Sequence, residues 1–220
     1  MVRPSVRQLQ TRRVMRALVL PILLAACTST APGEPASMRE RLAAETHLFV
    51  TNGDSAGAIT AQLRTADGWE DGVVDLRLAG GELVTRAAPG GAIALTSVQL
   101  ELQTIEIPAT VTGHEASLTR PRLELMAPAT AAATWTGDDS AELEVALALQ
   151  LSWTLTVDGV GVQVGAPHLP LLPVKLELTG DGAQVTADLR IHAAGELWGW
   201  ANLVKLSDLE LVLGADTPAR

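Results

Sequence analysis

Residues 141–157 alternate strictly between apolar and mostly polar side chains over seventeen positions. Every odd-numbered position is Ala, Leu, Val or Trp, and the even-numbered positions include Glu142, Glu144 and Gln150. A period of two over this length is typical of a β-strand that buries one face. Fully extended, the segment would span about 56 Å, whereas a compact domain of this size has a radius of gyration of about 16 Å. We therefore expect the strand to coil strongly, to cross a corner between two sheets, or to belong to an elongated domain.

Shorter segments repeat the same alternation. Residues 98–102, 174–178 and 185–191 each place Val, Leu, Ile or Ala at every second position, and turn residues separate the segments. Asp158-Gly159 is a strong two-residue hairpin signal directly after the long strand. Because the turns are short and no helical crossovers intervene, antiparallel pairing is favoured. The expected fold is all-β, an antiparallel meander that forms a β-sandwich or a strongly curved, elongated sheet, with one short N-terminal helix.

Three local signals refine this expectation. Ser37 followed by Glu40 has the form of a capping box, which predicts a helix from Met38 to about Thr46 with Met38 and Leu42 facing inward. The apolar phase shifts after Leu102, which predicts a β-bulge near residues 103–104. Residues 166–173 contain three Pro, so this segment is expected to cross an end of the core as an extended connection, not as a central strand.

The N-terminus has the organisation of an export signal. Five Arg and no acid precede Cys27, and residues 17–26 form a short apolar stretch. Ten residues are too few for a membrane-spanning helix, which needs about 20, so the pattern predicts a secretory signal. The stretch ends in Leu24-Ala25-Ala26-Cys27, which resembles the lipobox of bacterial lipoproteins: a Leu, two small residues and then Cys.

This resemblance implies that Cys27 receives a diacylglyceryl group, that the chain is cleaved before it, and that the new amino group is open to acylation. Two or three acyl chains give stable membrane attachment. Thr28, and not an Asp, follows the anchor, which in bacteria with two membranes implies delivery to the outer membrane. The alternatives are an ordinary secretory leader with an incidental Cys, and translation that starts at Met15. The expected organisation is a signal peptide (1–26), a lipid-anchored tether (27–36) and a single β-rich envelope domain (37–220).

Composition excludes some partners. Cys27 is the sole Cys, so no disulfide forms within the chain. Without the leader, 11 basic residues stand against 25 acidic ones, and an acidic domain repels nucleic acid. One Phe, no Tyr and five Trp are too few aromatic residues for a base-stacking surface or for the aromatic girdles of a transmembrane barrel. We expect no nucleic-acid partner.

One motif supports an enzymatic alternative. Residues 53–57 match G-x-S-x-G, the nucleophile elbow of α/β-hydrolases, with Ser55 as the nucleophile. The candidate partners are His168 or His192 with Asp158 or Asp188. Against this interpretation, few residues precede the motif and no alternating βα pattern follows. Moreover, Asn52-Gly53 is also a hairpin signal between strands at residues 47–51 and 55–64. The first hypothesis is therefore a non-catalytic domain, and a serine hydrolase is the alternative.

The remaining candidate residues concern ligands. The four His of the chain are His47, His114, His168 and His192. Their spacing matches no metal site, so we expect no metal or cofactor. Trp198 and Trp200 share one face if extended, and they are the candidate ligand contacts. The apolar face of the long strand needs a second layer, which is another sheet, a short helix or a bound apolar ligand. We expect a lipid-anchored envelope protein with a binding or structural role, for which an apolar ligand or lipid is the candidate partner.

Overall fold

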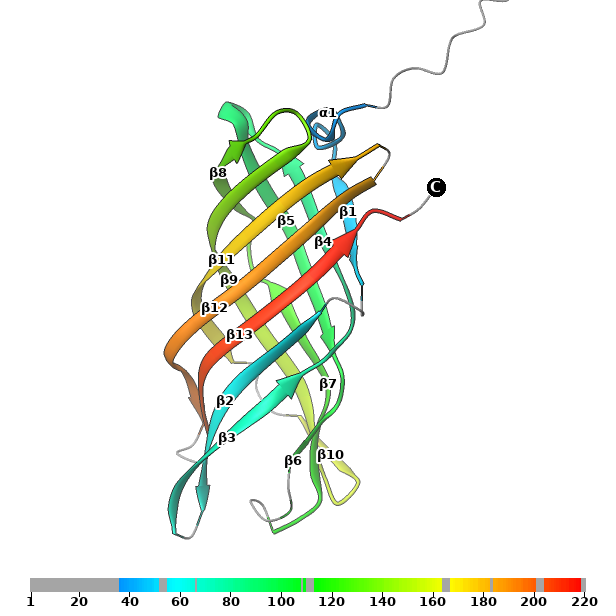
Figure 1. The fold of residues 1–220 in the computed structure, drawn as a ribbon. Coiled ribbons are helices and arrows are strands. Elements are labelled where there is room, and N and C mark those ends of the chain that lie inside the picture. Colours follow the sequence, from blue (N-terminus) through cyan, green and yellow to red (C-terminus); the bar gives the residue numbers. More distant parts are fainter. Residues whose placement is uncertain are drawn as a thin grey trace, which may run out of the picture. The chain divides into compact units, whose positions relative to one another are not determined.

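Antiparallel strands make up nearly all of the described chain (Figure 1). The computed structural model describes residues 36–51, 55–65, 67–107, 109, 113–163, 167–182, 184–200 and 204–218. In chain order the elements are α1 (Met38–Arg41), β1 (Thr46–Val50), β2 (Ala56–Thr65), β3 (Gly68–Leu76), β4 (Leu78–Ala87), η2 (Pro89–Gly91), β5 (Ala92–Leu102), β6 (Ile105–Ile107), β7 (Ala116–Leu125), β8 (Ala129–Trp135), β9 (Ser140–Val157), β10 (Val160–Gln163), β11 (His168–Asp181), β12 (Gln184–Trp200) and β13 (Val204–Asp216).

Eight of these strands close into a barrel. Their order is β1, β4, β5, β7, β9, β11, β12 and β13, and β13 pairs back with β1 at Phe49↔Asp216 and Val50↔Ala215. All neighbours are antiparallel, which confirms the all-β, antiparallel prediction. The sheet closes on itself and is a barrel, an outcome that the alternation along single strands did not specify.

Several long strands of the barrel are interrupted along their length. β1 and β2 both pair antiparallel with β13, through Val50↔Ala215 and Ala56↔Val212, so they lie end to end beside it. The predicted hairpin between residues 47–51 and 55–64 is therefore wrong, because the two segments run in the same direction and pair with the same neighbour. Asn52 and Gly53 themselves lie outside the described residues.

The long strand predicted at residues 141–157 is confirmed as β9, and Figure 1 shows it coiling along the length of the barrel. Its odd-numbered side chains are buried up to Leu149, whereas those from Gln150 to Val157 are half-buried on both faces. The predicted turn at Asp158-Gly159 is also confirmed, because Val157 pairs with Val160 and both turn residues have positive φ, 49° and 79°. The two halves of β9 thus have different surroundings.

Where the sequence predicts a β-bulge, at residues 103–104, the structure has a break between two strands. β5 ends at Leu102 and β6 begins at Ile105, and the Gln103 amide donates to the Arg77 carbonyl at 2.7 Å. The phase shift has the predicted consequence, because Leu102, Ile105 and Ile107 all line the same interior cavity.

The prediction for residues 166–173 is wrong in part, because β11 begins at His168 and includes Pro170 and Pro173. Up to Pro173 this strand pairs with β9 alone, with a register shift between His168 and Leu171, and β12 joins only from Val174. A proline on the side without a ladder partner removes no hydrogen bond. Leu169 and Leu172 are buried, as expected of a segment that covers the core, and Leu171 points outward.

The predicted N-terminal helix is present, and it closes one end of the barrel (Figure 1). Ser37 Oγ accepts from the Glu40 amide at 3.3 Å, and Glu40 Oε2 accepts from the Ser37 amide at 3.0 Å, which confirms the capping box. The helix ends at Arg41, earlier than predicted, while Met38 and Leu42 are fully buried. Gly180 of β11 lies so close that a Cβ there would come 2.8 Å from Met38 Cβ, so glycine is needed for the helix to seat.

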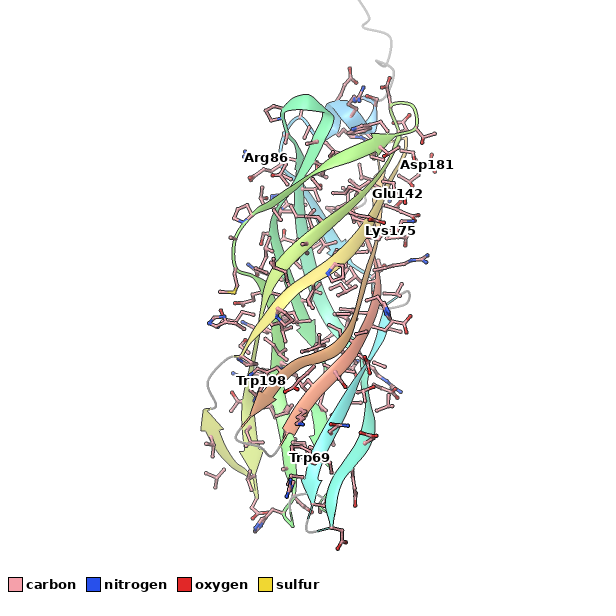
Figure 2. All side chains as sticks on the ribbon, turned by 90° about the vertical axis from the view of Figure 1, so that its left-hand side faces the viewer. Trp69, Arg86, Glu142, Lys175, Asp181 and Trp198 are labelled. Atoms are coloured by element: carbon pink, nitrogen blue, oxygen red, sulfur yellow. The ribbon has the colours of Figure 1, made fainter. Side chains whose placement is uncertain are left out.

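Polar side chains of the barrel face outward. Lys175 on β11 contacts Glu142 on β9 at 2.6 Å and Glu177 at 3.0 Å, and Figure 2 shows Lys175 beside Glu142. Hydrogen bonds to Glu142 and then to Glu177 raise the pKa of Lys175 above its ordinary value, and the hydrogen bond from Lys175 lowers the pKa of Glu177. The inner face carries the apolar core, which includes Leu147, Leu176 and Leu211. Within the described residues, no helix is long and apolar enough to cross a membrane.

Candidate ligand cavity

The wall of the barrel opens at the end opposite α1. Within the part of the chain that the structure describes, β3 pairs only with β2, and β6 pairs only with β7, so no ladder joins β3 to β6. We call this break the β3–β6 slit. A second break lies between β9 and β12, because β12 beyond Ile191 pairs only with β13. This half of the molecule therefore consists of two facing sheets, β12-β13-β2-β3 and β6-β7-β9-β10.

An apolar cavity lies between these two sheets. Its volume is about 170 Å³, and it is open to the outside. For comparison, an apolar cavity of about 150 Å³ stays dry and takes up a molecule the size of benzene. All the residues that line the cavity are apolar except Glu106. The lining residues are Ile59, Ala61, Leu63, Val74, Leu76, Leu102, Ile105, Glu106, Ile107, Leu118, Pro121, Leu123, Leu151, Trp153, Leu155, Leu169, Trp198, Val204, Leu206 and Leu209.

Two tryptophans lie across the second break. Trp153 on β9 and Trp198 on β12 make an edge-to-face contact, with ring centroids 5.6 Å apart and an interplanar angle of 76°. Both line the cavity, and Figure 2 shows Trp198 in the half of the barrel away from α1. Trp198 was a candidate ligand contact from sequence. Trp153 was assigned only to the buried face of the long strand, because no local pattern links it to Trp198.

Trp200, the other tryptophan singled out from sequence, belongs to β12, and its backbone pairs with Val204. Its side chain lies outside what the structure describes. Cys27 and the rest of the leader also lie outside the described residues.

Two carboxylates lie at the edges of the β3–β6 slit, and sequence reasoning singled out neither. Glu106 on β6 is the charged residue among those that line the cavity. Glu70 on β3 is directly opposite Leu63, a cavity-lining residue on β2, and directly opposed residues of antiparallel strands project from the same face. Thr65 Oγ1 lies 3.5 Å from Glu70 Oε1 on that face. Both carboxylates are exposed, and alternation along β6 turns the Glu106 side chain away from the cavity that its neighbours Ile105 and Ile107 line.

The residues of the hydrolase alternative do not have the strand–turn–helix arrangement of a nucleophile elbow. Ser55 Oγ donates to the Thr51 carbonyl at 2.9 Å, and a strand, β2, follows at Ala56 where an elbow requires a helix. Asp158 Oδ2 accepts a hydrogen bond from His114 Nδ1 at 2.8 Å, at the β9–β10 turn. In the described residues no hydrogen bond joins Ser55 to any of the candidate partners: His168, His192, Asp158 or Asp188.

The histidines do not form a shared site. His47 on β1 contacts Glu82 Oε1 on β4 at 2.6 Å, at the outer face of the barrel. Over the described ranges of the chain, no group of three or more His, Cys, Asp or Glu side chains is arranged to hold a metal ion. The cavity between the two sheets is therefore the feature on which a function can be argued.

Comparison with protein-family models, with curated proteins and with solved structures found no match.

Proposed function

We propose that this chain is a lipid-anchored protein of a bacterial envelope whose barrel holds an apolar chain, such as the acyl chain of a lipid, between its two facing sheets. The observation that carries the proposal is the cavity. Its walls come from nine strands and are apolar except at Glu106, and it is open to the outside. Preformed concave sites with mostly apolar walls and few polar groups are typical of small-molecule binding.

The energetics favour an apolar occupant. Each buried methylene group contributes about 0.8 kcal/mol, so a segment of six methylenes would contribute about 5 kcal/mol before the cost of immobilising the ligand. In the half of the barrel near α1 the interior is occupied by fully buried side chains such as Leu147, Leu172 and Leu178. The ligand is therefore held in the open half alone.

The surface of the barrel supports an acyl anchor as the means of membrane attachment. Transmembrane barrels turn apolar side chains outward to lipid and keep a polar interior. Here the arrangement is reversed, since exposed charges such as Glu142 and Lys175 lie outside and Leu176 lies inside. In this proposal the acyl groups of Cys27 hold the protein at the membrane, and residues 28–36 link Cys27 to the domain in the sequence.

The anchor and the cavity are tested separately. Cells that express the protein are labelled with radioactive palmitate, and label is expected in the wild type and absent in Cys27→Ala. Equal labelling of both proteins contradicts the anchor.

For the cavity, the purified protein is titrated with 1-N-phenylnaphthylamine, whose fluorescence rises in apolar surroundings. We expect a saturable rise that dodecyl maltoside reverses. A rise that never saturates, or none beyond that of the buffer or lipid alone, contradicts ligand binding.

A further inference from the structure

The apolar lining of the cavity continues beyond its rim onto β10. A row of paired residues crosses the sheet β6-β7-β9-β10 through Ile105, Leu118, Leu155 and Val162. Directly opposed residues of antiparallel strands project from the same face, and the first three of these residues line the cavity. Val162 therefore lies on the cavity side of the sheet, at the end of the row.

Val160 lies on the same face as Val162, because one residue of the strand separates the two. The exposed fractions of Val160 and Val162 are 66% and 48%, and neither belongs to the described residues that line the cavity. We call these two side chains the β10 ledge. The ledge continues the cavity wall, because Val162 pairs with the cavity-lining Leu155.

The β10 ledge lies on the side of β9 where the barrel wall is open. β11 pairs with this edge of β9 only as far as Gln150, and β10 pairs with β9 from Thr154 to Val157, where β7 occupies the other edge. Between these two segments, Trp153 contacts Trp198 across the break between β9 and β12. An acyl chain that leaves the cavity at this break therefore passes onto the ledge.

The size of the cavity limits how much of a ligand it encloses. A volume of about 170 Å³ suits a molecule of about the size of benzene, so a longer acyl chain leaves part of its length outside. The polar headgroup stays in water, because burying it without hydrogen-bond partners is unfavourable. This places the end of the chain in the cavity, and the part of the chain next to the headgroup needs an apolar surface beyond the rim.

We infer that the ligand is a long-chain amphiphile, with the end of its chain in the cavity and the part of the chain next to the headgroup over the β10 ledge. Val160 and Val162 thus determine specificity for chain length, because a short chain is held by the cavity alone. This inference rests on the proposed function and adds the chain-length class of the ligand to it.

The test uses the full acylated chain in nanodiscs of zwitterionic lipid, and maltosides with hexyl, octyl, decyl and dodecyl chains that each carry bromine at the chain end. The uncharged headgroup is the same in all four probes. Bromine quenches tryptophan fluorescence at short range, so quenching reports a chain end beside Trp153 and Trp198. Loss of most of the quenching in the Trp153→Phe, Trp198→Phe double variant assigns the signal to the cavity. Empty nanodiscs of the same lipid give the correction for probe that partitions into the bilayer.

In the wild type we expect the affinity to rise by about two- to fourfold for each added methylene from hexyl to dodecyl, where full burial of a methylene corresponds to about fourfold. The Val160→Thr, Val162→Thr double variant keeps the shape of the ledge but adds two hydroxyl groups. It should bind the hexyl probe within about twofold of the wild type and the dodecyl probe about fivefold or more weakly.

Val73→Thr is the matched control, because Val73 is 71% exposed and lies on the face of β3 opposite to the cavity-lining Val74. It should leave the affinities for all four probes unchanged. Circular dichroism verifies that each variant keeps its strand content.

The outcomes separate the two proposals. The chain-length inference is overturned, while cavity binding stands, if the wild-type affinity stops rising beyond the hexyl probe or if the ledge double variant matches Val73→Thr. An equal loss of affinity for the hexyl and dodecyl probes in the ledge variant also overturns it, because the valines would then act on the cavity as a whole. If no probe quenches Trp153 and Trp198 above the empty-nanodisc correction, both the chain-length inference and the proposed function fail.

Discussion

Trp153 and Trp198 make an edge-to-face contact at 5.6 Å although their strands, β9 and β12, share no ladder in the described part of the chain. The contact joins the two facing sheets where the barrel wall has opened. Aromatic pairs of this geometry contribute about 0.5–1.5 kcal/mol beyond the area that they bury. The pair therefore links the stability of the open half to the geometry of the cavity.

A double-mutant cycle measures this link. Trp153→Leu, Trp198→Leu and the double variant are unfolded with urea, and we expect a coupling free energy of about 0.5–1.5 kcal/mol between the two positions. The control cycle combines Trp153→Leu with Trp135→Leu, because Trp135 contacts Arg39 near α1 and not the cavity. A coupling near zero for Trp153 and Trp198 contradicts a stabilising contact between them.

A second prediction concerns the closed end. Leu42→Ala removes a fully buried side chain beneath α1 and should lower the free energy of unfolding by about 2–5 kcal/mol. Leu171→Ala is the same substitution at a site that is 66% exposed, and it should change stability by less than about 0.5 kcal/mol. Because α1 lies at the end away from the cavity, neither variant should change the affinity for 1-N-phenylnaphthylamine. Equal stability of the two variants contradicts the role of α1 in closing the barrel.

A third prediction follows from the ion pairs of Lys175. The pKa of Glu177 is lowered in the folded state, so its contribution to stability is present above the unfolded value of about 4.3 and is lost as pH falls through the folded value. The pKa of Lys175 is raised, so its contribution is present below about 10.4 and is lost as pH rises through the folded value. Lys175→Met should therefore be slightly less stable than the wild type at pH 7.

The loss is small because the side chains of Lys175, Glu142 and Glu177 are exposed. Thermal unfolding followed by circular dichroism at pH 7 and pH 3 measures the difference between the variant and the wild type. We expect this difference to shrink as the pH is lowered, because the contribution of Glu177 is lost as pH falls through its folded pKa. A difference that is as large at pH 3 as at pH 7 contradicts the assignment to this ion pair.

The sequence predicted single strands and tight turns well, because both depend on neighbouring residues. The alternation of residues 141–157, the Asp158-Gly159 turn and the Ser37–Glu40 capping box all have local causes and were confirmed. Barrel closure depends instead on which distant strands meet. Val50 pairs with Ala215, and no local pattern identifies that pair.

The cavity could not be predicted for a related reason. Leu149 and Leu155 occupy equivalent positions in the same alternating pattern of β9, yet Leu149 is fully buried and Leu155 lines open space. The difference comes from the neighbours, since β11 covers β9 only as far as Gln150. The same apolar periodicity thus builds a packed core in one half of the barrel and a cavity wall in the other. Sequence reasoning singled out Trp198 but not its partner Trp153, because only the arrangement of distant strands brings the two rings together.

The most direct test of ligand binding compares two neighbouring valines on β3. Val74 lines the cavity, whereas Val73 is 71% exposed on the opposite face of the strand. Wild type, Val74→Phe and Val73→Phe are purified from the same cells without added amphiphile other than the nanodisc lipid. The small molecules that each retains are then identified by native mass spectrometry. We predict a bound amphiphile in the wild type and in Val73→Phe, and at least a fivefold loss of it in Val74→Phe. Equal retention by Val74→Phe and Val73→Phe, or a wild-type protein that carries no amphiphile and accepts none, would contradict the account.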